Sequence, residues 1–402
     1  MDFLKNVVQA PPDPILGINL AFAADSRSDK LNASVGTYRQ NDLQPYIFPS
    51  VKEAERVLFS QEKNKEYLPI AGEADYLKAT QQLVFGQADL SRICGMQAVG
   101  GTGALRLTAE ILSHAGLNTL YLGEPTWGNH QNIFTTVGFQ IRSFPYFDFH
   151  THRINFAQLC EQISKMQAGS ALLLQASCHN PTGCDFSKDE WKEILRLIQR
   201  HQLFVVFDLA YQGFGEGLEE DVWPIRLFVQ EGVSCAVAVS HSKTFGVYAE
   251  RVGALFMVCA SPTQAEIVLS RIKVIARRAY SNPPCHGARV IKTLLQTKEL
   301  KALWEKELQE VRQRIASMRQ LLVSELSLHL KQDISNFSYL LEQKGMFAFV
   351  GISSYQVETL KKKYGIYLTE DGRINLGGVN AQAVQTLVRA LAQIPDIQHS
   401  TS

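Results

Sequence analysis

Three strand-like apolar runs stand next to residues that carry chemistry, and this pattern restricts the folds open to the chain. The runs and their polar neighbours are 203–207 with Asp208 and Tyr211, 235–239 with Ser240 and Lys243, and 253–259 with Arg251 just before it. In open α/β sheets, ligands bind at the edge where the parallel strands end. The pattern therefore predicts that these side chains meet at one such edge.

Four of these five residues match the needs of pyridoxal phosphate. Lys243 offers an amine to the aldehyde, Asp208 a carboxylate to the pyridinium nitrogen, and Arg251 and Tyr211 a cation and a hydroxyl. Each residue alone also has an ordinary structural interpretation without a cofactor. A lysine among small polar residues is usually solvated, an aspartate at a strand end is often a helix cap, and an arginine beside an acidic residue forms a weak surface pair.

Strand-like and helix-like segments alternate along the chain. The expected helices are 104–115, 187–201, 298–331 and 380–394. The expected strands are 119–122, 171–175, 203–207, 235–239, 253–259, 345–350, 364–367 and 373–376, the last two joined by the turn 370–372. Ser187 and Glu190 form a capping-box signature at the start of the second helix. Such alternation predicts an α/β fold with a mostly parallel sheet and right-handed crossovers.

The length of 402 residues indicates two or more domains at roughly 150 residues each. We expect residues 46–309 to form a large α/β domain that binds the cofactor. Residues 1–45 and 310–402 would form a smaller α+β domain with an N-terminal arm.

Composition argues against several classes of partner. Forty basic and 39 acidic residues nearly cancel, so neither nucleic acid nor an anionic membrane is an expected partner. No apolar run approaches the ~20 residues of a membrane span, and the first residues do not resemble a signal peptide. Seven scattered cysteines without a Cys-x-x-Cys pair favour reduced thiols and a cytoplasmic location. We interpret His150 and His152 as solvated, and no ligand spacing indicates a metal site.

Weaker motifs leave alternatives open. The run 100–103, Gly-Gly-Thr-Gly, precedes the helix expected at 104 and is either an anion site or a plain turn. Trp127 either packs in the core or lies on a flat ring, and Asn180 before Pro181 is either a donor or part of a turn. The glycines at 213, 215 and 217 fail the register of a dinucleotide fingerprint and are interpreted as a loop.

Taken together, in their order along the chain, the motifs are far more specific than any one alone. The blocks are Tyr67–Gly72, Gly100–Gly103, Pro125–His130, Cys178–Gly183, Asp208–Phe214, Ser240–Lys243, Glu250–Gly253 and Tyr280–Pro284. With these blocks the sequence resembles the class I, fold-type I aminotransferases, and within them the aspartate/aromatic branch. The resemblance extends from about residue 13 to about residue 394. Departures at Thr37, Glu124 and His241 bear on specificity more than on chemistry.

The resemblance implies a role for each matching residue. Lys243 binds the cofactor and moves the proton, Asp208 holds the ring nitrogen with His130 behind it, and Tyr211 and Asn180 bond the phenolic oxygen. Trp127 stacks on the ring. The residues implied for the phosphate are Gly101, Thr102, Ser240, Arg251 and, from the other subunit, Tyr67. Near the substrate stands Gly36, and Arg373 with Asn180 binds its α-carboxylate. Arg277 of the other subunit binds its second carboxylate. The family pattern also implies cis bonds at 124–125 and 180–181, and a homodimer with shared sites.

The implied reaction is reversible amino transfer between L-aspartate and 2-oxoglutarate. The nearest alternative is an aromatic aminotransferase with dual specificity, because an arginine at 277 can swing away for an apolar ring in some relatives. A β-lyase or decarboxylase on the same cofactor is disfavoured by the pairing of Arg277 with Arg373. A ligand-binding protein without catalysis is disfavoured because every chemical residue is present, although fold alone could not exclude it.

Overall fold

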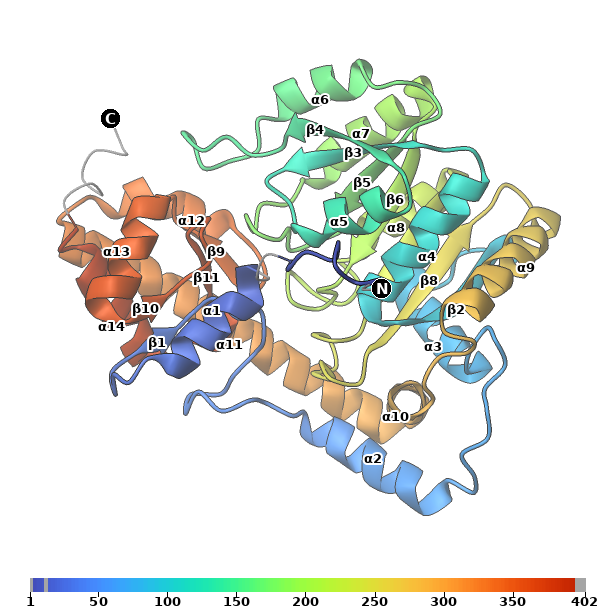
Figure 1. Ribbon diagram of the computed structural model, residues 1–402, viewed down its shortest axis with the longest axis horizontal. Helices are drawn as coiled ribbons and strands as arrows, with labels where there is room; N and C mark the ends of the chain where they lie inside the picture. The colour runs from blue at the N-terminus through green and yellow to red at the C-terminus, as the bar shows by residue number, and fades with distance from the viewer. Residues whose placement is uncertain (1–2, 11–13, 395–402) are drawn as a thin grey trace.

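The computed structural model describes residues 3–10 and 14–394 (Figure 1). Within them, the α-helices are α1 (Pro14–Ala24), α2 (Pro49–Gln61), α3 (Ala74–Phe85), α4 (Gly100–His114), α5 (Asn129–Thr136), α6 (Phe156–Ser164), α7 (Lys188–His201), α8 (Trp223–Gln230), α9 (Pro262–Ala279), α10 (His286–Gln296), α11 (Lys298–Leu330), α12 (Ser338–Glu342), α13 (Ser354–Tyr364) and α14 (Ala381–Leu391). Two short 3₁₀ helices lie in the same part of the chain, η1 (Ile334–Phe337) and η2 (Leu376–Gly378). No helix in these residues has the length and apolar character needed to cross a membrane.

Figure 1 shows two lobes, and a mixed sheet built from strands between residues 93 and 258 forms the centre of the larger one. The strands of the described residues are β1 (Leu31–Asn32), β2 (Ile93–Val99), β3 (Thr119–Glu124), β4 (Gln140–Pro145), β5 (Ala171–Gln175), β6 (Phe204–Leu209), β7 (Cys235–Ser240), β8 (Val252–Val258), β9 (Phe347–Phe349), β10 (Ile366–Tyr367) and β11 (Arg373–Asn375). Seven of these described strands pair in the order β2-β8-β7-β6-β5-β3-β4. Among these seven, β8 alone runs in the opposite direction, so it is antiparallel to both of its neighbours, β2 and β7. The predicted α/β fold with a mostly parallel sheet is confirmed.

Side chains that alternate along the strands build a separate core on each face of the sheet. Leu172 and Leu174 of β5 face one core, and Leu173 faces the other. Helices α4, α5 and α9 cover the face of Leu173. Helices α3, α6, α7, α8 and α10 contribute to the opposite core. Because both faces are covered, the central strands β5, β6, β7 and β8 are buried along almost their whole length, whereas the edge strand β4 is mostly exposed.

Local signals located several elements well. The strand expected at 171–175 is confirmed residue for residue, and Ser187 and Glu190 make both bonds of the predicted capping box. Both cis bonds implied by the resemblance, at 124–125 and 180–181, are present. Several boundaries were wrong. Helix α4 begins at Gly100, so the glycine run forms the first turn of the helix and does not precede it, and the strand expected at 345–350 spans only Phe347–Phe349.

The smaller lobe contains two short pairs of strands in the described residues. Strand β10 pairs in parallel with β1, and β11 pairs antiparallel with β9. The strands expected at 364–367 and 373–376 are therefore shorter than predicted, and each finds a partner distant in sequence. Figure 1 shows this lobe at the end of the molecule where α1, α13 and α14 lie.

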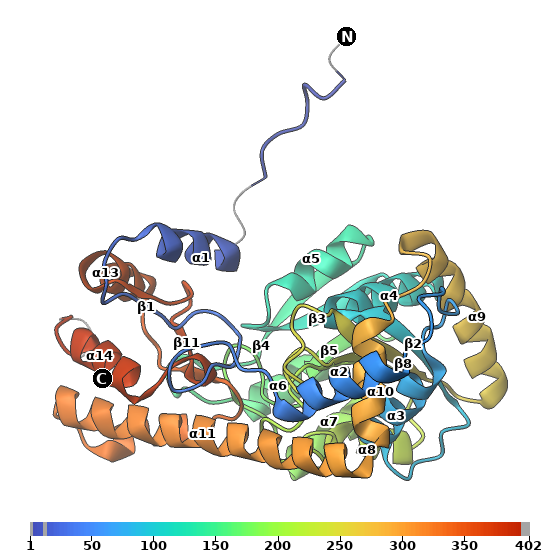
Figure 2. The same ribbon diagram turned by 90° about the horizontal axis from the view of Figure 1, so that it is seen from below.

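Helix α11 runs beneath both lobes (Figure 2). Its residue Trp304 is fully buried, and its indole Nε1 donates to the carbonyl of Thr244 at 2.9 Å. The ring stacks on Phe245 with centroids 4.5 Å apart. Thr244 follows Lys243, so this helix holds the loop that carries the lysine. The domain division at 45/46 and 309/310 stays a proposal, and its second boundary falls inside α11.

We predict that Trp304→Ala lowers the free energy of unfolding by about 3–5 kcal/mol, because a large buried side chain is lost from a packed site. Trp304→Phe keeps a ring against Phe245 but leaves the Thr244 carbonyl without its donor, for a loss of about 1–3 kcal/mol. Urea denaturation of both variants measures the difference. Trp223, which is only half-buried, provides the control. Equal losses for Trp304→Ala and Trp223→Ala would contradict this role of Trp304.

Candidate active site

A cavity of about 220 Å³ opens at the carboxyl edge of the parallel strands. Its lining comprises Gly36, Gly101, Thr102, Leu105, Trp127, Gln175, Asn180, Asp208, Ala210, Tyr211, Ser240, Ser242, Lys243, Arg251, Phe347 and Arg373. Strands β5, β6 and β7 end side by side there, with Gln175 opposite Asp208 in the register. Strand β8 runs the other way and begins at the same edge, just after Arg251. The edge thus collects the polar residues that sequence analysis placed at strand ends.

Asp208 is buried and fixed from behind by a histidine. Its Oδ2 lies 2.8 Å from Nε2 of His130, which is fully buried and does not line the cavity. Nδ1 of the same imidazole lies 2.9 Å from the hydroxyl of Thr126. Both ring nitrogens are engaged, so the imidazole holds the carboxylate in one orientation.

Lys243 enters the cavity from the loop after β7. Its amine lies 5.0 Å from the centroid of the Tyr211 ring. Burial lowers the pKa of this amine to about 8, and the nearby Asp208 carboxylate opposes part of that shift. A larger share of the amine is therefore neutral, and nucleophilic, at neutral pH than for a solvated lysine. Burial also raises the pKa of the Tyr211 hydroxyl above its ordinary value.

Arg373 and Asn180 lie next to each other in another part of the cavity lining. An Nη1 of Arg373 donates to Oδ1 of Asn180 at 2.7 Å, and Nη2 donates to the carbonyl of Ser34 at 3.0 Å. The Nε of Arg373 is buried and has no partner among the described residues. Gln175 fixes Asn180 by accepting from its backbone N–H at 2.8 Å and donating to its carbonyl at 2.9 Å. This part of the lining presents a buried cation whose Nε has no partner among the described residues.

A second cationic corner lies at the first turn of α4. The free N–H groups of a helix N-terminus favour an anion, and Gly101 and Thr102 belong to that turn. A Cβ at Gly100 would lie 2.5 Å from Nη2 of Arg251, so only glycine allows the guanidinium to approach. Nη1 of Arg251 donates to Ser242 Oγ at 3.2 Å and to the Tyr248 carbonyl at 3.1 Å, rather than pairing with Glu250.

Trp127 and Gly36 also line the cavity. Trp127 is half-buried, and its ring meets that of His130 edge to face at 5.2 Å. The lining thus includes an aromatic ring and a residue without a side chain beside the two arginines.

Two of the expected site residues lie elsewhere. Tyr67 has 84% of its surface exposed, and Arg277 is exposed at the end of α9, where it bonds Ser281. Neither lines the cavity of its own chain. The other expected residues line it, apart from His130, which touches Asp208.

Sequence reasoning missed several lining residues. Gln175 ends a strand as Asp208 does, so its position at a strand end was an available signal. Ser242 stands next to Lys243, whereas Leu105, Ala210 and Phe347 carry no polar signal at all. The solvated reading of His152 was wrong: its ring stacks on Tyr339 at 4.3 Å, and burial lowers the pKa of its imidazole. In the described part of the chain, no group of three or more His, Cys, Asp or Glu could hold a metal ion.

Comparison with known proteins agrees with this geometry. The model of the family "Aminotransferase class I and II" matches residues 28–391. An aspartate aminotransferase of Pseudomonas aeruginosa is 41% identical over 98% of this chain and 100% of its own length. The mitochondrial aspartate aminotransferase of Gallus gallus is 39% identical over 97% of this chain and 93% of its own.

Solved structures give the same result. The aromatic-amino-acid aminotransferase of Burkholderia pseudomallei, covalently bound to pyridoxal phosphate, superposes with a TM-score of 0.94 at 37% identity, over 98% of this chain and 99% of its own. The aromatic amino acid aminotransferase of Psychrobacter sp. B6, crystallised with aspartic acid, has a TM-score of 0.94 at 34% identity, over 97% and 99% of the two chains. The chain therefore belongs to the class I and II aminotransferases.

Proposed function

We propose that this chain is an aspartate aminotransferase that uses pyridoxal 5′-phosphate to transfer an amino group reversibly between L-aspartate and 2-oxoglutarate. The observation that carries the proposal is one cavity that holds an amine, a histidine-supported carboxylate and two separate arginines. Relatives named aspartate aminotransferase, which match nearly the whole chain, support the same reaction.

The residues present fit the proposed cofactor. The amine of Lys243 would bind its aldehyde carbon, and Asp208 would accept from its ring nitrogen. The first turn of α4, with Ser240 and Arg251, would hold its phosphate at a corner where glycine leaves room for the guanidinium. When bound, pyridoxal phosphate supplies an electron sink for the bond broken at the substrate Cα.

The chain's own residues then have separate tasks. Asp208 keeps the ring nitrogen protonated, because a carboxylate at hydrogen-bond distance favours its charged form, and His130 holds that carboxylate in place. Lys243, once its amine is free, removes the proton from the substrate Cα and returns it as a general acid. Tyr211 and Asn180 would donate to the phenolic oxygen, and Trp127 would cover one face of the ring and exclude water from that side.

Two arginines match a substrate with two carboxylates. Arg373 presents a buried Nε without a partner among the described residues, which suits the α-carboxylate. We propose that Arg277 of a second copy of the chain binds the other carboxylate, as the resemblance implies. In its own chain this side chain does not line the cavity, so it is left to serve a neighbouring one. Such charge-assisted contacts are specific, since losing one leaves a desolvated charge without a partner.

We also propose that the protein is a cytoplasmic homodimer, and the exposed residues support the shared sites of that dimer. Tyr67 and Arg277 are exposed in the single chain, as residues that serve a neighbouring site would be. Residues 3–10 extend away from both lobes in Figure 2, with Phe3 and Val8 each 85% exposed. An arm of this kind needs a surface to cover its apolar side chains, and a second copy would offer one.

An aromatic aminotransferase with dual specificity is the second candidate. It is favoured by the similarity to solved aromatic aminotransferases, one of which was crystallised with aspartic acid. Adding single amino acids to the loaded enzyme and following the absorption of the bound cofactor separates the two. Aspartate should change the spectrum at a far lower concentration than phenylalanine or tyrosine does, and responses to aspartate and to the aromatic amino acids at similar concentrations would favour the second candidate.

We predict that borohydride fixes the cofactor to the peptide that contains Lys243, because reduction traps the amine on the aldehyde carbon. Attachment should become faster as pH rises through about 8, where the amine loses its proton, and should level off above it. Peptide mapping by mass spectrometry measures the first, and stopped-flow absorbance of the cofactor-free enzyme the second. Lys243→Ala is the control, and label on another lysine of the wild-type enzyme refutes the assignment.

We predict that Arg277→Ala lowers kcat/KM for L-aspartate by about a hundredfold or more, while kcat/KM for phenylalanine changes little. Arg373→Ala should lower both, since every amino acid shares the α-carboxylate. Arg278→Ala, at the neighbouring exposed arginine of α9, is the matched control. Equal losses on both substrates with Arg277→Ala would show that Arg277 does not read the second carboxylate.

We predict that refolding Lys243→Ala together with Arg277→Ala restores aspartate activity. In a mixed dimer with shared sites, one site collects both lesions and the other none. Random pairing makes half the dimers mixed, so about a quarter of all sites are intact under two-fold symmetry.

The matched control mixes Lys243→Ala with Arg373→Ala. Both residues line the cavity of a single chain, so no mixed dimer contains an intact site. Recovery to about a quarter of wild-type activity in the first mixture only is the expected result. Activity no higher than that of the parents in both mixtures would rule out shared sites.

A further inference from the structure

The ring of Phe347 lies directly against the guanidinium of Arg373. The carbon Cζ of Arg373 is 4.2 Å from the centroid of that ring. Phe347 is buried, lies on β9 and lines the cavity. Because β9 and β11 are antiparallel with Arg373 opposite Phe349, the guanidinium reaches diagonally along the strand to arrive over Phe347.

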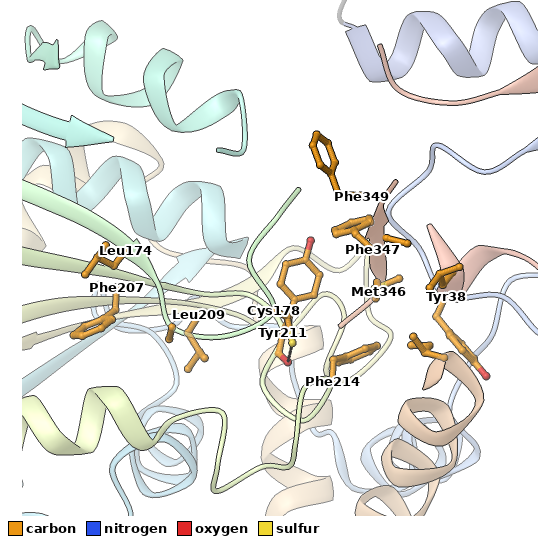
Figure 3. Close-up of a cluster of buried hydrophobic side chains, with 14 of the residues drawn as sticks. Tyr38, Leu174, Cys178, Phe207, Leu209, Tyr211, Phe214, Met346, Phe347 and Phe349 are labelled. Carbon is orange, nitrogen blue, oxygen red and sulfur yellow. Dashed lines mark hydrogen bonds between the residues drawn. The ribbon is translucent and has the colours of Figure 1, made fainter. Parts of the chain in front are cut away.

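The same ring also packs against Tyr211 and lies close to Gly36, which both line the cavity. It meets the ring of Tyr211 edge to face, with centroids 5.9 Å apart (Figure 3). A Cβ built on Gly36 would lie 3.5 Å from its Cζ, at ordinary contact distance. Phe347 therefore fills the space below Arg373 and leaves the guanidinium little room to turn.

A buried arginine fixes the backbone of Phe347. Arg319 of α11 donates to the carbonyls of Gly345 at 2.7 Å and Phe347 at 3.0 Å. The carbonyl of Met346 accepts from the N–H of Leu376 at 2.8 Å. The strand on which the ring stands is thus held on both sides before any substrate binds.

Arg373 depends on such support. Its hydrogen-bond partners, Asn180 and Ser34, are neutral acceptors, and burial lowers the pKa of its guanidinium. A π face within about 6 Å attracts a cation, more strongly where water is excluded. The ring offsets part of the desolvation of the charge and also defines the plane of the guanidinium.

We propose that Phe347 is a positioning residue: its ring holds the Arg373 guanidinium in the plane that presents its donors to the substrate α-carboxylate. The inference rests on the proposed function, in which Arg373 binds that carboxylate. It assigns part of the carboxylate affinity to an apolar side chain that makes no hydrogen bond with the substrate.

Phe347→Leu tests the proposal by removing the π face while keeping an apolar side chain. The probe is succinate, a dicarboxylate that binds without turnover, and calorimetry gives its Kd on the enzyme loaded with cofactor. Loss of a partly desolvated cation–π contact should raise this Kd by roughly three- to thirtyfold. KM for L-aspartate should rise by a similar factor, with kcat changed less than KM.

Phe349→Leu is the matched control. Phe349 stands on the same strand and is equally buried, but its ring packs on Phe147 at 5.4 Å and does not line the cavity. Phe349→Leu should lower the thermal midpoint about as much as Phe347→Leu does, and it should leave the Kd of succinate within twofold of the wild-type value. An equal rise of that Kd in both variants would assign the effect to lost core packing and overturn the proposal.

A double-mutant cycle with Arg373→Lys separates a direct role from one through Arg373. A lysine amine has no plane for the ring to hold, so adding Phe347→Leu should change the Kd by less than twofold in that background. The inference is overturned if Phe347→Leu raises the Kd of succinate by the same factor in both backgrounds, or if it leaves that Kd unchanged in the wild-type background. Wild-type enzyme that fails to transaminate aspartate would contradict the proposed function instead, which the succinate measurement does not require.

Discussion

Parallel pairing of β5, β6 and β7 is the constraint on which the site depends. Because parallel strands end at one edge, the residues that follow them are brought together although they are far apart in sequence. Asp208 lies at the end of β6, and Asn180 and Lys243 come shortly after β5 and β7. The antiparallel β8 adds Arg251 at the same edge, because its start lies where its neighbours end.

The charges gathered at this edge need support from the layers behind them. His130 behind Asp208, Gln175 beside Asn180 and Phe347 beneath Arg373 are all buried, and none relies on solvent for its position. A desolvated charge is expensive unless it is paired or hydrogen-bonded, so these neighbours matter for stability as well as for orientation. The site is held by its surroundings before a substrate arrives.

Helix α11 connects these supports over a long distance. Trp304 bonds the carbonyl next to Lys243 on the larger lobe, and Arg319 bonds the carbonyls of Gly345 and Phe347 on the smaller one. One helix therefore anchors the loop of the lysine and the strand beneath the substrate arginine. Its rigidity fixes the relative position of two parts of the site that the cavity brings together.

The sequence by itself determined five strands of the central sheet, β5 with both ends correct and the others to within two residues, and the chemistry placed beside them. Apolar runs and a capping box are local signals, so the span of β5 and the start of α7 followed from short stretches of residues. Long-range pairing was decided only by the tertiary structure: β10 joins β1, β11 joins β9, and His152 is covered by Tyr339. Phe347 carries no polar signal, and its place under Arg373 depends on the register of two strands whose partners no local pattern specifies. Burial and strand register are properties of the assembled chain, because they depend on contacts between residues distant in sequence.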